Sequence, residues 1–464
     1  MALSRIWSVF ILIALFTAAV KTAFVSGNSP LFSSMVVGKS KDTITISKIP
    51  LAKAGETLLT QTDSSRVYKS NGVESKRTGD GLVHTYRLQQ ADGLLETCQT
   101  AVNICLKLIG FLTFFMGLLA IAEKAGGIRF LSRIISPFFS RIFPDVPGNH
   151  PAMGHMMMNF SANLMGLDNA ATPFGIKAME SLQEINPHPE RASNAQIMFL
   201  CLHASGLTLI PVSIIALRAE AENPMDIFIP CMIATFVATL AAMIIVGIKQ
   251  KIRLLQPVLL LWVLGISAVM ALLVVYINGL DQDGVSVFSG MLSSGIILLV
   301  ILLIVLGGMY KKIDLFDAFV QGAKGGFDTA IRIIPYLVGM LVAISLLRTS
   351  GCFDLLIAGM KSLFAMLGTD TRFVDGLPTA LVKPFSGGAA RGMMVDTMNT
   401  YGADSFAGRL ACVLQGSSDT TFYVIAVYFG AVSVRNTRYT VGAMLLADLV
   451  GIVVSVMLAY LFFG

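Results

Sequence analysis

The sequence predicts an all-α integral membrane protein made of two repeated halves, and three observations support this fold class. The chain is 55% hydrophobic and 13% charged, with a mean hydropathy of +0.74. Several apolar runs reach the roughly 20 residues that cross a bilayer as a helix: Phe228–Ile248, Pro257–Ile277, Val287–Met309 and Val441–Phe463. Two polar, Gly-rich stretches, Met153–Met179 and Pro378–Met398, are each followed by an apolar segment that small polar residues interrupt.

The first element is an apolar run that begins after Arg5 and extends to Ala23. It is either a cleaved signal peptide or a membrane anchor, residues 1–25. We favour an uncleaved anchor, because no small-x-small cleavage site precedes an obvious mature end. Either interpretation puts the following segment outside the cytoplasm.

Residues 26–90 form the soluble-looking part of the sequence. Apolar and polar residues alternate in Thr43–Ser47 and Leu82–Leu88, and Gly and Asp turns separate these patches. Alternation with period two is typical of strands. We therefore expect a small extracytoplasmic β-like insert of two or three strands that lies on the membrane body.

The basic loops predict the orientation of the membrane helices. Lys249–Arg253 and Lys311–Lys312 are expected in the cytoplasm, and the acidic loop Asn278–Gly284 outside. This gives about nine membrane helices, with Ile197–Leu217 and Leu410–Val432 each counted as one span. The two polar stretches must then enter and leave on one side, as re-entrant hairpins.

Direct comparison within the chain indicates an internal repeat, residues 91–250 and 311–464, joined by connecting transmembrane helices in 251–310. Leu106–Ala122 is expected to run inward and its counterpart Ile333–Leu347 outward, so the repeats are predicted to be inverted. Inverted repeats place binding sites near the midplane, between broken helices. The alternative is that duplication only builds a larger scaffold.

Composition and motifs exclude several functions. The net charge of +6 comes from short basic loops and does not indicate nucleic-acid binding. A P-loop, HExxH, GxSxG or clustered His/Cys motif is missing from the sequence, so we expect no enzyme, no metal and no cofactor. The six cysteines lie singly in mostly apolar surroundings, as packed thiols do.

Specific strings of residues resemble two known families. Asn159–Asn163, Gly166–Pro173, Ser193–Ala195 and Leu207–Pro211 closely resemble spore maturation protein A. The following strings closely resemble spore maturation protein B: Ala323–Phe327, Ile334–Leu337, Lys383–Gly387, Tyr401–Phe406 and Gly416–Tyr423. The resemblance covers nearly all of residues 91–464 and excludes the insert, as in a fusion of the two.

Both families are grouped with nucleoside-recognition or gate domains, and related domains occur in the ferrous iron transporter B and in concentrative nucleoside transporters. The resemblance implies membrane transport or gating, and it does not establish nucleoside as the substrate. The sequence departs from the family pattern at Ala389–Arg391, where a small-residue run is usual, and at His203, where a small amide is expected.

The candidate site combines small polar and ionisable side chains from the hairpins and the broken helices. The full set of candidate substrate-binding residues is Asn159, Asn163, Asp168, Asn169, Ser205, Thr208, Ser386, Arg391, Gln415, Ser417, Asp419 and Thr420.

Asn159 and Asn163 share one helix face, where their amides suit a nucleobase, sugar or peptide-like solute or serve to join helices. Asp168 and Asn169 fit a turn or helix cap, or a solute contact. Ser205 and Thr208 can instead bond their own helix backbone.

Asp419 is the most informative single residue, because an ionisable group in a membrane segment is usually functional. It can bind a cation, carry a coupling proton, or pair with Arg391 or Lys383. Arg391 can hold an anionic solute or form that ion pair, and His203 can titrate or pack.

We expect a multi-pass protein of the cytoplasmic (inner) membrane that transports or gates a small polar solute. A secondary transporter is the leading form, and a passive channel or a non-transporting scaffold of envelope assembly are the alternatives. The expected partners are the solute, membrane lipid and no nucleic acid. Small-residue faces such as Gly322–Gly326 would permit a homo-oligomer.

Overall fold

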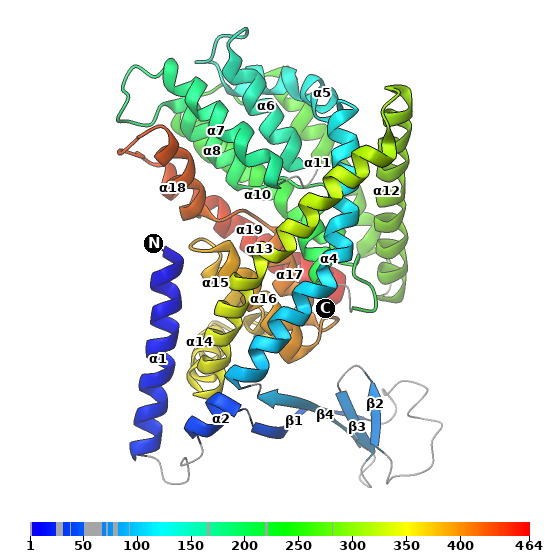
Figure 1. Ribbon diagram of the computed structural model, residues 1–464, viewed down its shortest axis with the longest axis vertical. Helices are drawn as coiled ribbons and strands as arrows, with labels where there is room; N and C mark the ends of the chain where they lie inside the picture. Colours follow the sequence, from blue (N-terminus) through cyan, green and yellow to red (C-terminus); the bar gives the residue numbers. More distant parts are fainter. Residues whose placement is uncertain are drawn as a thin grey trace.

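The computed structural model describes residues 2–24, 31–37, 39–50, 67–70, 73–77, 82–91, 93–164, 168–218, 221–280 and 282–464. Two sets of helices follow one another in the chain (Figure 1). The first set comprises α4 (Leu94–Lys124), α5 (Gly127–Ile142), α6 (Pro151–Leu164), α7 (Asp168–Glu184), α8 (Asn194–Ala204), α9 (Val212–Leu217) and α10 (Phe228–Lys249).

The second set repeats this order. It comprises α13 (Leu315–Thr349), α14 (Cys352–Met366), the 3₁₀ turn η2 (Arg372–Asp375), α15 (Leu377–Val382), α16 (Gly387–Tyr401), α17 (Phe406–Gly416), α18 (Thr421–Ala431) and α19 (Thr440–Phe463). Two apolar helices, α11 (Pro257–Asn278) and α12 (Gln282–Tyr310), connect the sets.

Local features mark equivalent points in the two sets. The long helices α4 and α13 both end at a glycine in the left-handed region, Gly126 (φ 82°) and Gly351 (φ 72°), where other residues are strained. Both α8 and α17 begin at a serine, Ser193 and Ser405, whose side chain accepts a hydrogen bond from the backbone three residues on. The same stop and start signals therefore shape both halves.

The most extensive helix contact among the described residues joins α4 to α13, which run in opposite directions (Figure 1). Gly322 and Gly326 make this approach possible, because a Cβ at either position would lie 2.6 Å or less from backbone or side-chain atoms of α4. The small-residue face that the sequence offered for association with another copy is thus covered by α4 of the same chain.

The described residues contain seven helical segments long and apolar enough to cross a membrane, or eight if one bent pair is a single span. The bent pair is Leu337–Thr349 with Cys352–Met366, at 74°. The expectation of about nine spans counted Ile197–Leu217 as one of them. The segment is divided at the interruption that the sequence predicts, because α8 ends at Ala204 and α9 starts only at Val212, and it is therefore not one of the long apolar spans.

The N-terminal helix α1 (Ala2–Phe24) packs along α13. Trp7 Nε1 donates a hydrogen bond to Gly339 O (3.0 Å), and Lys21 Nζ donates to Ser350 O (2.7 Å) at the bend before α14. An ammonium group beside the last carbonyls of a helix also complements the helix dipole. Helix α1 is therefore attached to the body of the protein at two separate points.

A short helix, α2 (Leu31–Val37), and an antiparallel sheet lie between α1 and α4. The strands are β1 (Lys39–Pro50), β2 (Val67–Ser70), β3 (Val73–Arg77) and β4 (Leu82–Ala91), and they pair in the order β1-β4-β3-β2. The sheet thus has more strands than the two or three expected, and it contains the alternating patch 82–88.

The apolar core extends across both halves. One cluster combines Met156 and Leu200 of the first set with Val424, Phe429 and Ala447 of the second. A second cluster combines α9 and the start of α10 with α16 and α17. Because these clusters are shared, the two halves form one packed body around the segments at which α8 and α17 end.

Four charged side chains join the halves near the starts of α10 and α17. Arg218, which is buried, donates to Asp226 Oδ1 (2.9 Å) and Asp404 Oδ1 (3.3 Å), and Arg409 Nε donates to Asp226 Oδ2 (2.5 Å). Removing one partner from a buried ion pair typically costs about 3–5 kcal/mol, since the other charge is left without its partner. This cluster therefore holds the two inter-helix loops in a fixed relation.

Candidate functional site where two helix breaks meet

The first break follows α8, and its hydroxyl groups bond its own backbone. Ser205 Oγ lies 2.8 Å from Leu202 O and 3.0 Å from Thr239 Oγ1, and Thr208 Oγ1 donates to Gly206 O (2.7 Å). Gly206 adopts a left-handed conformation (φ 61°). These bonds satisfy the end of α8 without a solute, which is the structural role considered for both hydroxyls.

The second break follows α17 and is bonded in a similar way at its start. Ser417 Oγ donates to Leu414 O (2.9 Å), three residues back, as Ser205 does to Leu202. Asp419 Oδ1 then accepts from the backbone N–H of Thr420 (2.7 Å), the residue directly before α18, and a carboxylate beside the start of a helix complements the helix dipole. The side chain of Asp419 remains 49% exposed.

The two breaks are in direct contact. The backbone N–H of Asp419 donates to the carbonyl of Ala204, the last residue of α8, at 2.7 Å. A carbonyl that α8 leaves without a helical donor is thereby satisfied by the other half of the protein. The same contact brings Asp419 Oδ2 to 3.9 Å from His203 Nε2.

A buried polar network lies behind this contact. His203 Nδ1 lies 2.8 Å from Asn163 Nδ2 and 3.1 Å from Asn159 Oδ1, and Asn159 Nδ2 donates to Ala171 O (2.7 Å) of α7. The ring of Tyr428 meets the His203 ring edge-on at 4.8 Å. Asn159 and Asn163 lie four residues apart on α6, as their spacing predicts. The His203 ring contacts both side chains and so joins them.

The protonation of His203 decides which of these contacts is a hydrogen bond. A neutral ring with hydrogen on Nδ1 donates to Asn159, which leaves Nε2 as an acceptor. The other neutral tautomer accepts from Asn163 and directs Nε2–H towards Asp419. The arrangement can therefore hold a proton at two alternative atoms, one of which faces the exposed carboxylate.

A glycine makes room for the tyrosine of this network. A Cβ at Gly175, on α7, would lie 2.5 Å from a ring carbon of Tyr428 and 2.8 Å from both its hydroxyl and Asn159 Nδ2. Helix α18 can approach α7 this closely only because position 175 has no side chain (Figure 1).

Lys383 bonds the end of α17, on the N-terminal side of the second break. This side chain is 4% exposed, and its Nζ donates to Leu414 O (3.0 Å) and also to Gln415 O, the last carbonyls of α17. Phe422 N donates to Pro384 O (2.9 Å), which adds a backbone bond between the α15–α16 turn and α18. A positive charge at a helix C-terminus is favourable, and here it belongs to the protein itself.

The remaining predicted residues lie around this turn. Ser386 caps α16 by accepting from Ala389 N (3.2 Å), and a Cβ at Gly387 would lie 2.7 Å from the hydroxyl of Thr420. Gln415 Oε1 is buried without a hydrogen-bond partner among the described residues. Arg391 is half-buried, and no hydrogen bond or ion pair joins its guanidinium group to any part of the chain that the structure describes.

Asp168 and Asn169 are the first two residues of α7. Their side chains lie outside the described part of the structure, so the predicted turn or solute contact stays a prediction. Among the described His, Cys, Asp and Glu side chains, no group of three or more could hold a metal ion.

Comparison with known proteins identifies the family. The Gate family, described as nucleoside recognition, matches residues 105–221 and 330–435. Spore maturation protein B of Bacillus subtilis (strain 168) is 47% identical over 173 residues, 37% of this chain and 96% of that relative. Spore maturation protein A of the same organism is 41% identical over 156 residues, 33% of this chain and 80% of that relative.

The chain belongs to the family of the spore maturation proteins A and B. The two relatives match separate halves, and each half contains one Gate region. No solved structure matches the chain. The two helix breaks of this chain lie within the two Gate regions, one in each.

The fold brings two further residues to the site, Tyr428 and Asp448, which the sequence does not point to as site residues. Tyr428 is predicted as an ordinary aromatic residue of an apolar helix, and Lys383 is expected as a partner for Asp419 but bonds carbonyl groups instead. Asp448 of α19, which is 6% exposed, accepts a hydrogen bond from Thr421 Oγ1. A signal for Asp448 was present, since it is an ionisable residue inside an apolar run.

Proposed function

We propose that this multi-pass membrane protein moves or gates a small polar solute through a site between its two halves. The contact of the two helix breaks, Asp419 N–H to Ala204 O at 2.7 Å, is the observation that carries the proposal. Within a membrane, non-helical backbone is tolerated only where it is buried in protein or lines a water-filled cavity. A pair of breaks that meet at an exposed carboxylate is the arrangement expected of a solute site.

The proposed architecture is a pair of inverted repeats with re-entrant hairpins. Helices α4 and α13, which begin the two halves, run in opposite directions (Figure 1), and this supports the inversion. In such proteins one half rocks or gates against the other around the bound solute. The inter-half contact between residues 204 and 419 would then change during the cycle.

We infer the solute chemistry from the polar groups of the two breaks that are not fully engaged by the described residues. These include the Arg391 guanidinium, Gln415 Oε1 and the half-exposed carboxylate of Asp419. Such a set suits a small solute that carries both donors and acceptors, and Arg391 favours an anionic group on it. Since His203 can present a proton to Asp419, we propose a proton-coupled secondary transporter in which Asp419 is the coupling carboxylate.

A ligand screen is the first test of a solute site. Nucleosides, small peptides, organic acids and divalent metals are added to the detergent-purified protein, and the thermal unfolding midpoint is measured. A ligand in hundredfold excess over its dissociation constant stabilises the native protein by about 2.7 kcal/mol. A hit that Asp419→Asn or Asn163→Ala abolishes supports the site. If no solute in a broad library raises the unfolding midpoint, the result argues for a scaffold.

Uptake into proteoliposomes then separates transport from its alternatives. In Asp419→Asn we expect pH-gradient-driven uptake of the hit to fall at least tenfold. The matched control is Asp370→Asn, which removes the same charge from an exposed pair with Arg372 and should transport normally. A channel would instead give flux without coupling and an altered selectivity in Asp419→Asn. If Asp419→Asn is folded and indistinguishable from the unmodified protein in every assay, the site assignment is wrong.

We also infer that the protein has no enzymatic activity. Its proposed partners are the solute and membrane lipid, and they do not include nucleic acid. The small-residue face at Gly322 and Gly326 is occupied by α4, so an oligomer would have to use another surface.

A further inference from the structure

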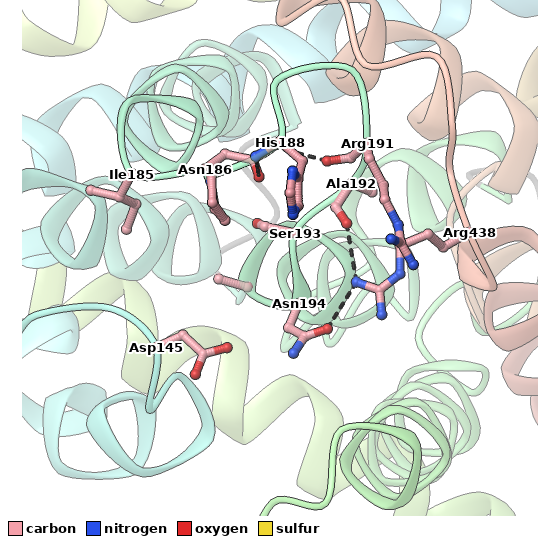
Figure 2. A pocket seen from close by; sticks show the side chains of 11 residues that line it. Asp145, Ile185, Asn186, His188, Arg191, Ala192, Ser193, Asn194 and Arg438 are labelled. Atoms are coloured by element: carbon pink, nitrogen blue, oxygen red, sulfur yellow. Dashed lines mark hydrogen bonds between the residues drawn. The ribbon is translucent and has the colours of Figure 1, made fainter.

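A pocket of about 450 Å³ lies away from the helix breaks, at a junction of the two halves. Residues 185–188 and 191–195 of the first half and Arg438 of the second line it, with Asp145 at the opposite side (Figure 2). Backbone bonds join the two halves here: Arg435 N and Asn436 N donate to Glu190 O (3.0 and 2.9 Å), and Ala192 N donates to Asn436 O (2.9 Å).

The pocket lies at the ends of membrane-spanning helices. Gln250, directly after α10, donates from Nε2 to Asn194 O (2.7 Å) and to the hydroxyl of Tyr439 (3.0 Å), directly before α19. Helices α10 and α19 are two of the apolar spans, so their ends mark the bilayer surface. The adjoining loop contains Lys249, Lys251 and Arg253 and is predicted to face the cytoplasm.

Two arginines, one from each half, give the pocket its positive charge. Arg438 Nη1 donates to Ala192 O (3.1 Å) and Asn194 Oδ1 (2.9 Å), both neutral acceptors, so its charge is not compensated by a carboxylate (Figure 2). Arg191 is exposed, and in the described part of the chain its guanidinium has no hydrogen bond or ion pair. Asp145 is the one carboxylate among the lining residues, and His188 adds an imidazole ring.

The backbone at Arg438 is held in an unfavourable conformation. Its φ of 53° lies in the left-handed region, which a residue with a Cβ adopts at a cost of about 1–2 kcal/mol. Strain of this kind persists where the surrounding structure requires it, often at ligand sites. Here it directs a guanidinium group, already oriented by two hydrogen bonds, into the pocket.

We propose that this pocket binds the phosphate group of an anionic ligand at the cytoplasmic membrane surface. Guanidinium groups match the oxygens of a phosphate in planar, paired hydrogen bonds, and two of them from different segments suit a group with three free oxygens. The volume exceeds that of a bare phosphate ion, so a larger molecule enters with it. The phosphate belongs either to an acidic phospholipid headgroup or to a soluble phosphate monoester.

Binding at this place links the two halves, because the ligand contacts Arg191 of one and Arg438 of the other. The bound state therefore has a reinforced junction at residues 188–192 and 435–438. This inference does not depend on transport, and it predicts that a phosphate ligand raises the stability of the whole protein by mass action.

The test uses the full-length purified protein and two sources of phosphate. In detergent, inorganic phosphate or glycerol 3-phosphate is titrated at constant ionic strength, and the unfolding midpoint is followed. In parallel, the protein is placed in nanodiscs of phosphatidylcholine, with or without phosphatidylglycerol. The variants are Arg191→Gln, Asp145→Asn and, as the matched control with the same charge change, Arg435→Gln, whose side chain is 83% exposed and does not line the pocket.

Loss of one charged hydrogen-bond donor predicts about tenfold weaker binding in Arg191→Gln, tighter binding in Asp145→Asn, and no change in Arg435→Gln. This pattern with soluble phosphate identifies a monoester site. The same pattern only with phosphatidylglycerol identifies a lipid headgroup site. No stabilisation from either source, or equal stabilisation of all variants, overturns the proposal.

Discussion

The two helix breaks begin alike and end differently. At both, a serine bonds the carbonyl three residues back, Ser205 to Leu202 and Ser417 to Leu414. Beyond this point the first break is satisfied by neutral groups, namely its own hydroxyls and the Asp419 backbone. The second contains a carboxylate and is held by a buried ammonium group, that of Lys383.

The two halves therefore differ in the chemistry that they place at their breaks. The first half places a buried network of amides and an imidazole there, and the second half places a carboxylate and an ammonium group. In many transporters the carbonyls of an unwound helix coordinate a coupling cation, and here the Lys383 ammonium occupies the carbonyls of α17. A sodium ion is therefore not needed to satisfy the end of this helix.

Removing the ammonium should have the largest effect. Lys383→Met leaves two buried carbonyls without their charged donor, and we expect a loss of about 3 kcal/mol in unfolding free energy, measured by denaturant unfolding in detergent. The control is Lys361→Met, whose side chain is 40% exposed and pairs with Asp375, with an expected loss below about 1 kcal/mol. Equal losses in the two variants would show that Lys383 is not what holds the second break.

The imidazole of the first half is expected to have a smaller effect on stability. His203→Gln keeps an amide that can bond Asn159 or Asn163 but loses the ring contact with Tyr428 and the exchangeable proton. We expect a loss of about 1–2 kcal/mol, and uptake that no longer depends on the pH gradient. The control is His150→Gln, a histidine that lines neither site and accepts a hydrogen bond from the nearby Ala152 N. Retained pH coupling in a folded His203→Gln protein would remove His203 from the proton pathway.

Substitution of Ser205 and of Ser417 tests whether the hydrogen bond at the start of each break contributes equally to stability. Ser417→Ala should cost about 0.5–1.5 kcal/mol, the usual net contribution of one hydrogen bond. Ser205→Ala should cost slightly more, because Ser205 also contacts Thr239. Both are measured by thermal unfolding with and without solute. A change in solute affinity in either variant would mean that the hydroxyl contacts solute instead of its own helix.

The surface pair used as a control for transport also has a defined pH behaviour. Hydrogen bonds from the Arg372 backbone and side chain lower the pKa of Asp370 below its usual range, so this contribution to stability is present above the unfolded-state pKa and is lost as the pH falls through the folded-state value. Both side chains are largely exposed, and screening keeps the contribution small.

The sequence by itself determined the fold class, the family and the positions of the interruptions. Apolar runs of sufficient length require membrane helices, and residues such as Gly206 and Asp419 cannot continue such a helix at low cost, so the breaks are visible locally. The pairing of Asn159 with Asn163 follows from helical spacing alone. The interruption of Ile197–Leu217 is likewise visible as small polar residues inside an apolar run, and the structure divides the segment there, between the end of α8 at Ala204 and the start of α9 at Val212.

Only the tertiary structure decided which partners the polar groups take. Lys383 bonds carbonyls of α17, and Asp419 meets His203 rather than Lys383 or Arg391, because helices distant in sequence pack side by side. The same holds for the pocket between Arg191 and Arg438, residues that no sequence spacing connects. A sequence states which groups must be satisfied in an apolar surrounding, and the packing of distant segments determines what satisfies them.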